Sequence, residues 1–225
     1  MGEVISLEQR RGSRAGTRSH GSAVSRRPAC ALWFDLASPS TYFAAERADR
    51  LFPGLAWRPV LTAPEHDAPL TEAGVDALHV AAAARAQELR MPFVWPEGHP
   101  VAGRAAMRVA AFAAERALAS SFVLAASRLA FCGGFDLDDP EILAEAAAAA
   151  ALPLDECLRA AGDGSRDALM EGAGRKLRAH GAHVLPVLTV GSQAFCGEQR
   201  LAEAAAAVRD PGQQRRAAPL DEFAG

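Results

Sequence analysis

The feature that most restricts the fold is the order in which two hydrophobic patterns follow one another along the chain. Residues 31–36, ALWFDL, form a short apolar run typical of a strand buried on both faces. A helical pattern extends from about Pro39 to Leu51, and 55–61, LAWRPVL, is a second strand candidate. Because a helix between two strands normally makes a right-handed crossover, these residues predict a parallel strand–helix–strand unit.

A long helical block follows. Between 63 and 162 apolar residues recur at spacings of three and four, and glycine or proline separates helix-length segments. No strand candidate occurs inside this block of roughly a hundred residues. A further helix, 167–181, ends on Gly181, a residue suited to a helix C-terminus.

Two strands and a helix complete the pattern. The segment VLPVLTVG, from Val184, is separated from a short second strand by GSQ, which predicts an antiparallel hairpin. A helix follows from about Gly197. Without the helical block, this order of elements is that of thioredoxin, and with it the order is that of the DsbA-like variant. We therefore predict an α/β, thioredoxin-like fold with a large all-helical insertion.

The same pattern predicts the domain organisation. The thioredoxin-like domain is expected to comprise 30–62 and 163–208, interrupted by a helical insertion domain at 63–162. Residues 1–29 contain six arginines and no hydrophobic period, which predicts a disordered leader. A targeting function is the alternative, but no apolar segment follows the twin arginines. Residues 209–225 predict a flexible tail.

Charge and hydropathy exclude several partners. The net charge of −3 gives no reason to expect nucleic acid or an anionic membrane surface as a partner. No apolar run approaches the roughly 20 residues that a membrane-spanning helix needs.

The cysteines and histidines predict neither a disulfide framework nor a metal site. The four cysteines are scattered and form no CxxC pair, which predicts free thiols and a cytoplasmic protein. Cys196, beside the last helix, is either a slightly acidic thiol or a buried small residue. His180 and His183 have no third ligand nearby, so no metal site is expected.

The first motif with chemical meaning is Ser38-Pro39-Ser40-Thr41. Serine is a good N-cap and proline is favoured at the first helical position, so capping is one interpretation. The same helix start presents unpaired N–H groups and the positive end of the helix dipole, which attract anions. A hydroxyl and a helix end together would lower the pKa of a bound thiol from about 8.5.

The second motif surrounds Pro186, which precedes a run of strand residues and cannot donate a hydrogen bond to the strand ladder. Either it is a trans proline on an edge strand, or the Leu185–Pro186 bond is cis at the start of the strand. In the cis case the backbone of Leu185 faces outward and can pair with an extended peptide. Glu198 and Gln199 then begin the last helix, as caps or as contacts to the amine and carboxylate of a ligand.

Five segments together resemble the 2-hydroxychromene-2-carboxylate isomerase family. They are FDLASPSTYFAAERA, WRPVL, LRMPFVWPEGHPVAGRAAMRVAAFAAERA, FCGGFDLDDPEIL and HVLPVLTVGSQAFCGEQRL, in register from about Leu32 to Val208. That family is related to the kappa-class glutathione transferases and, more distantly, to the DsbA oxidoreductases. The resemblance implies a DsbA-type thioredoxin fold, glutathione as cofactor, and a small aromatic carboxylate as substrate.

The resemblance also implies roles for single residues. Ser38 corresponds to the serine that hydrogen-bonds the glutathione sulfur, and it stands where a redox relative has the first cysteine of CPxC. Thr41 stands at the second cysteine. Leu185 and a cis Pro186 would clamp the cysteinyl backbone of glutathione. The positions that bind the γ-glutamyl end fall on Glu198 and Gln199, where relatives often have a polar residue and an aspartate.

The chain departs from the family after the second strand. Relatives often carry an asparagine and frequently a lysine there, whereas TAPEHDAPLTEAG contains neither, and His66 is the nearest polar candidate. The resemblance further implies that Phe93 and Trp95, with Arg104 or Arg108, stack on and pair with an aromatic carboxylate. The alternative for these four residues is core aromatics and solvated arginines.

The function implied by the resemblance is a glutathione-dependent cis–trans isomerisation of an intermediate in aromatic degradation. A kappa-like glutathione transferase and a catalytically inactive thioredoxin-like protein that binds a thiol or peptide are the alternatives. Disulfide exchange is disfavoured because both positions of the CxxC motif carry hydroxyls, Ser38 and Thr41. Relatives are often dimers, so a homodimer is an alternative to a monomer.

Overall fold

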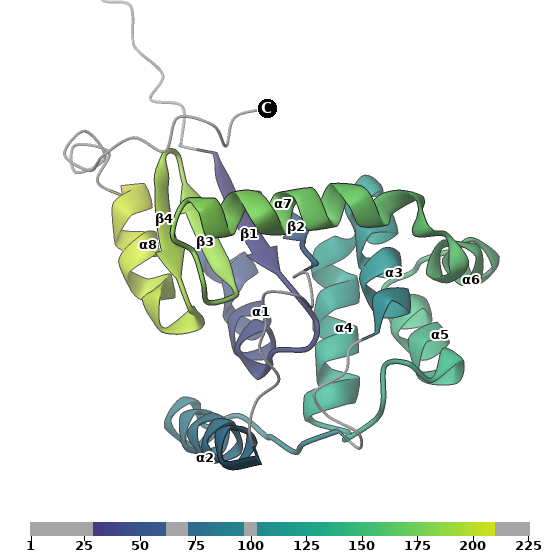
Figure 1. Ribbon diagram of the computed structural model, residues 1–225, viewed down its shortest axis with the longest axis horizontal. Coiled ribbons are helices and arrows are strands. Elements are labelled where there is room, and N and C mark those ends of the chain that lie inside the picture. Colours follow the sequence, from purple (N-terminus) through teal and green to yellow (C-terminus); the bar gives the residue numbers. More distant parts are fainter. Residues whose placement is uncertain (1–28, 62–71, 97–102, 210–225) are drawn as a thin grey trace, which may run out of the picture.

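A four-stranded mixed sheet forms the centre of the fold, with the strand order β2-β1-β3-β4. The computed structural model describes residues 29–61, 72–96 and 103–209 (Figure 1). β1 (Cys30–Phe34) pairs in parallel with β2 (Ala56–Pro59) and antiparallel with β3 (Val187–Val190). β3 pairs antiparallel with β4 (Gln193–Cys196). The predicted parallel unit and the predicted hairpin are both confirmed.

The first helix, α1 (Pro39–Leu51), connects β1 to β2. It begins at proline after a serine N-cap, as the sequence predicts. It ends where the N–H of Phe52 donates to the carbonyl of Ala48 and the chain turns through Gly54 at a φ of +79°. A positive φ of this size favours glycine, so Gly54 specifies the turn into β2.

The alternating side chains of the strands separate the sheet into two faces. On one face Leu32, Phe34 and Leu188 are buried in the main hydrophobic cluster, which also contains side chains of α1 and of α8 (Leu201–Arg209). On the other face Val187 packs with Leu177 of α7 (Asp167–Ala179), the helix that crosses the sheet in Figure 1. The sheet is therefore covered by helices on both faces.

Between β2 and α7 the described residues form helices and connecting loops but no strand, which confirms the predicted all-helical insertion. The helices are α2 (Glu72–Leu89), α3 (Arg104–Glu115), α4 (Ala119–Phe131), α5 (Pro140–Ala149) and α6 (Leu154–Gly162), followed by the short 3₁₀ helix η3 (Gly164–Arg166). In Figure 1 α4 lies alongside α1, whereas α2 lies at the edge of the molecule on the other side of α1. The division into two domains with the predicted boundaries stays a prediction.

The strands are shorter than the apolar runs that predict them. β1 ends at Phe34 because the chain turns at Asp35, whose Oδ1 accepts the N–H of Ser38 at 3.0 Å. Leu36 is nevertheless buried, at 2% exposure, which explains why it continues the strand pattern. The predicted leader and tail, apart from Ala29 and Arg209, lie outside the described residues.

The first residue of α7, Asp167, ties this helix to α3. Arg108 donates from Nε to Oδ1 at 2.9 Å and from Nη2 to Oδ2 at 2.7 Å, and Arg104 donates from Nη1 to Oδ2 at 3.0 Å. The hydrogen bonds from Arg108, followed by those from Arg104, lower the pKa of Asp167 below its ordinary value. The carboxylate form is therefore the one that the fold stabilises.

Stability is expected to fall at acid pH through this contact. A carboxyl group whose pKa is lower in the folded state stabilises the fold above its unfolded pKa, and this contribution is lost as the pH falls through the folded pKa. We expect Asp167→Asn to flatten the loss of unfolding free energy below about pH 4, measured by denaturant unfolding at several pH values. Asp76→Asn, which removes an exposed carboxylate of α2, should keep the wild-type slope. If the unfolding free energies of wild type and Asp167→Asn changed with pH in parallel, Asp167 would make no pH-dependent contribution to stability.

Candidate functional site

Three of the segments singled out in the sequence, those around Ser38, Pro186 and Glu198, gather at one end of the sheet. Trp33 of β1 faces Val187 of β3, and Val187 faces Cys196 of β4. One end of the sheet is therefore formed by the end of β1, the start of β3 and the end of β4. Three segments adjoin this end: the start of α1 at Ser38, the Leu185–Pro186 pair, and the chain from Gly197 onward. The strand register thus joins parts of the chain that are far apart in the sequence.

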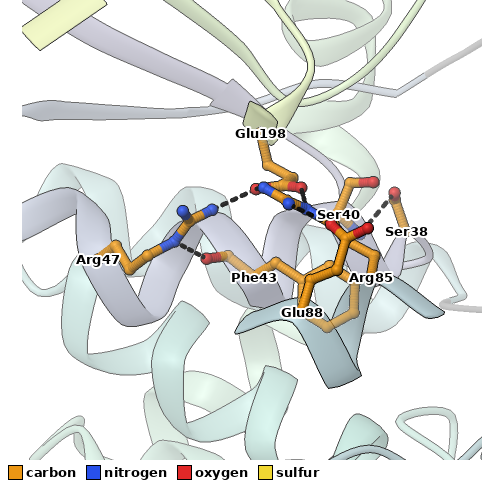
Figure 2. Close-up of polar contacts among 7 residues, drawn as sticks. All are labelled: Ser38, Ser40, Phe43, Arg47, Arg85, Glu88 and Glu198. Atoms are coloured by element: carbon orange, nitrogen blue, oxygen red, sulfur yellow. Dashed lines mark hydrogen bonds and ion pairs between the residues drawn. The ribbon is translucent and has the colours of Figure 1, made fainter. Parts of the chain in front are cut away.

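Ser38 caps α1 with its side chain. Its backbone is extended, with φ −92° and ψ 126°, and its Oγ accepts the N–H of Ser40 at 3.2 Å (Figure 2). The capping interpretation is therefore confirmed. Accepting this bond uses an oxygen lone pair, so the hydroxyl proton of the half-buried Ser38 can still be donated to another acceptor. The first turn of α1 itself contains no acidic residue, and the nearest carboxylate in the sequence, that of Asp35, accepts the N–H of the N-cap Ser38.

The Leu185–Pro186 bond is cis, which settles the choice between the two interpretations of this proline. The carbonyl of Pro186 accepts the N–H of Gly197 at 2.8 Å, and Gly197 has a φ of +86°, a conformation that favours glycine. Leu185 is half-buried, and no backbone hydrogen bond among the described residues engages its N–H or carbonyl. Its backbone therefore has donor and acceptor capacity for an extended ligand.

Glu198 is the centre of an ion-pair cluster. Its side chain is 3% exposed, in the 3₁₀ helix η4 (Glu198–Arg200), and both of its oxygens contact arginines (Figure 2). Arg85 of α2 donates from Nε to Oε1 at 2.5 Å and from Nη2 to Oε2 at 3.3 Å. Arg47 of α1 donates from Nη2 to Oε2, and from its Nε to the carbonyl of Phe43 at 3.0 Å. We call Arg47, Arg85 and Glu198 the arginine–glutamate cluster.

This cluster gives Glu198 a different role from those expected. The sequence indicated a cap or a ligand contact, and the side chain instead neutralises two guanidinium groups within the protein. Neither arginine was predicted as a site residue. A partial signal exists for Arg47, a charged residue between the buried Ala44 and Ala48 of α1. Gln199, the other predicted contact of this segment, is exposed.

Thr41, which stands at the second cysteine of the CPxC motif, is fully buried in the first turn of α1. Its Oγ1 has no hydrogen-bond partner among the described residues. A buried hydroxyl without a partner loses its hydration without compensation, which costs about 1–3 kcal/mol.

Thr41→Val is therefore expected to stabilise the protein by about 1 kcal/mol, because valine has a similar shape and removes the unsatisfied hydroxyl. The measurement is the free energy of unfolding in denaturant. Thr189→Val is the matched control, since the buried Thr189 accepts from Trp33 Nε1 and donates to the carbonyl of Ala31, each at 3.3 Å. This control should be destabilised. Equal losses in both variants would show that the Thr41 hydroxyl is satisfied.

Aromatic side chains join α2 to the core near α1. The ring of Phe93 lies 5.6 Å from Phe43 and 6.0 Å from Phe131, and Trp95 stacks on His79 of α2 at 4.1 Å between ring centroids. Phe93 and Trp95 are half-buried and pack against the main hydrophobic cluster. They therefore pack against the core while remaining partly exposed, and their predicted contact with an aromatic ligand stays a prediction.

The remaining polar candidates are engaged elsewhere or lie outside the described residues. Arg104 and Arg108 both pair with Asp167, and Arg104 also pairs with Glu171 at 3.0 Å. His66 lies outside the described residues. Among the described residues, no group of three or more His, Cys, Asp or Glu side chains has the arrangement of a metal site. None of the helices in the described part of the chain is long and apolar enough to span a membrane.

The cysteines are free thiols, as predicted. Burial raises the pKa of Cys196 above the ordinary thiol value, although Arg200 opposes this effect. The interpretation of Cys196 as a slightly acidic thiol is therefore wrong, because desolvation of the thiolate outweighs the nearby positive charge.

Comparisons with known proteins define the class. The fold is that of the thioredoxin-like proteins of the DsbA type, as predicted. The chain belongs to the family of DSBA-like thioredoxin domains, whose model matches residues 30–209. No curated protein matches the chain.

Two solved structures illustrate the class. A 2-hydroxychromene-2-carboxylate isomerase superposes with a TM-score of 0.66 at 17% identity, covering 83% of this chain and 97% of that one. The cytosolic disulfide reductase DsbM from Pseudomonas aeruginosa gives a TM-score of 0.62 at 18% identity, covering 84% and 100%. These identities show a shared fold.

Proposed function

We propose that this protein is a glutathione-dependent isomerase of the 2-hydroxychromene-2-carboxylate isomerase type. The observation that supports the proposal best is the position of Ser38. Its half-buried hydroxyl caps α1 and retains a proton to donate. It lies at the same end of the sheet as Leu185 and Pro186. A thiolate at this point would gain a hydrogen bond and the positive end of a helix.

The backbone of Leu185 provides the second part of the proposed site. Its N–H and carbonyl have no hydrogen-bond partner among the described residues, so they fit a cysteinyl residue that lies alongside them as an added strand. The exposed Gln199 is the proposed contact for the γ-glutamyl end. Glu198 would act there through Arg47 and Arg85 rather than by direct contact.

When bound, glutathione would supply a thiolate that adds to a conjugated carbon and is expelled after rotation about the former double bond, without net gain or loss of electrons. Ser38 would hold the sulfur in its ionised form by hydrogen bonding. Leu185 would fix the cysteinyl backbone so that the sulfur faces the substrate. We propose a small aromatic carboxylate as the substrate and the cytoplasm, where glutathione is abundant, as the location.

A kappa-like transferase and a non-catalytic thiol- or peptide-binding protein are the alternatives. The transferase would use the same thiolate but release a conjugate. The chain's own residues speak against disulfide exchange, because Ser38 and Thr41 carry hydroxyls where that chemistry needs thiols.

The test begins with calorimetry of the purified protein with glutathione at millimolar concentration. Heat of binding, followed by glutathione-dependent interconversion of a hydroxychromene carboxylate and its open-chain isomer, is the expected result. Binding with release of a conjugate would favour the transferase. Absence of binding would overturn the proposal and leave a thiol-independent role.

A further inference from the structure

Arg85 has more hydrogen-bond donors than its contacts within the protein use. It lies on α2, in the helical insertion, and its side chain is 30% exposed. A guanidinium has five N–H donors in a fixed plane. Nε and Nη2 donate to Glu198, and Nη1 donates to Glu88 of the same helix at 2.7 Å. One edge of the guanidinium thus binds Glu198, and Glu88 takes only part of the other edge.

Figure 2 shows the carboxylates of Glu198 and Glu88 in contact with Arg85, and the two differ in burial. Glu198 is 3% exposed and is held from two sides, so it fixes the orientation of the guanidinium. Glu88 is 65% exposed, and an exposed pair of this kind contributes little to stability. The outer edge of Arg85 is therefore oriented by the protein but only weakly occupied.

The position of Arg85 relates it to the proposed site. Glu198 follows Gly197, whose N–H is bonded to the carbonyl of Pro186. Arg85 Nε lies 2.5 Å from Glu198 Oε1. Glu198 belongs to the segment to which the proposed function assigns the γ-glutamyl end of glutathione. The only lysine of the chain, Lys176, lies on α7, on the opposite face of the sheet from α1.

We infer that Arg85 binds the γ-glutamyl carboxylate of glutathione through its outer guanidinium edge, displacing Glu88. This inference rests on the proposed function and deepens it. Glu198 is then the residue that positions Arg85, and Glu88 is a competing carboxylate from the protein itself. A bidentate Arg–carboxylate pair is among the stronger polar contacts in proteins, which makes Arg85 the expected determinant of affinity for an acidic ligand.

Calorimetric titration of glutathione into variants tests the inference. Arg85→Gln is expected to weaken binding about tenfold or more, because a charge-assisted bidentate contact is lost. Glu88→Gln is expected to tighten binding about threefold, because the competing exposed ion pair is removed. Arg90→Gln and Asp76→Asn make the same charge changes at exposed positions of the same region and should alter Kd less than about twofold.

A purely structural role of Arg85 gives different results. The dipeptide cysteinylglycine lacks the γ-glutamyl group, so Arg85→Gln should leave its affinity unchanged, and unfolding in denaturant should confirm that the variant is folded. An equal loss of affinity for both ligands, or no tightening in Glu88→Gln, would overturn the inference. If wild type binds glutathione and these variants bind it equally well, the inference fails and the proposed function stands. If wild type binds no glutathione, both fail.

Discussion

Replacing Ser38 by alanine is expected to raise the pKa of the bound glutathione thiol by about one to two units. The cause is the loss of one hydrogen bond to a charged acceptor, worth about 1.5–3 kcal/mol, at about 1.4 kcal/mol per pKa unit. Loss of the N-cap adds a fall in stability of about 1 kcal/mol. The thiol pKa is measured by pH titration of the ultraviolet absorbance of the thiolate at saturating glutathione.

Ser40→Ala is the matched control for this experiment. It removes the next hydroxyl along α1 but keeps the backbone N–H that donates to the Ser38 Oγ. The pKa of the bound thiol should therefore stay at its wild-type value. Isomerisation should slow in Ser38→Ala at neutral pH in proportion to the lost thiolate fraction. An unchanged pKa in Ser38→Ala would remove Ser38 from the mechanism.

Replacing Glu198 by glutamine is expected to cost about 2–4 kcal/mol of unfolding free energy. The substitution keeps the shape of the side chain but leaves Arg47 and Arg85 without their shared carboxylate. Breaking a buried pair costs about 3–5 kcal/mol, and the partial exposure of both arginines, at 26% and 30%, reduces this figure. Denaturant unfolding at neutral pH measures the loss.

Glu203→Gln is the control for a surface ion pair. Glu203 contacts Arg200 three residues away, and the two side chains are 57% and 44% exposed. Its loss should be much smaller than that of Glu198→Gln because solvent screens an exposed pair. Similar losses in both variants would mean that the arginine–glutamate cluster is no more important than a surface contact.

The sequence predicted those parts of the fold that local pattern determines. The run LWF, the Ser38-Pro39 helix start and the GSQ turn each specify an element within a few residues, and all three are found in the structure. The sequence located Pro186 at the start of a strand but could not decide whether its peptide bond is cis, because a trans proline on an edge strand fits the same residues. The strand ends were predicted one or two residues too far, since Leu36 is buried outside the sheet.

The contacts of the site could not be predicted in the same way. Arg85 and Glu198 are separated by 113 residues, and no local pattern links a helix of the insertion to the short 3₁₀ helix that follows the hairpin. The burial of Thr41 without a partner likewise depends on packing around α1 and not on its neighbours in sequence. Placement of these side chains requires the three-dimensional arrangement of α1, α2 and η4.

The edge strand β2 has a consequence for self-association. Its four residues, AWRP, put an exposed Arg58 and a half-buried Pro59 in a strand at the edge of the sheet. A proline offers no N–H donor to a further strand, and a charged residue at the edge opposes pairing with a strand of a second copy. The β2 edge of the sheet is thereby protected from aggregation by strand addition.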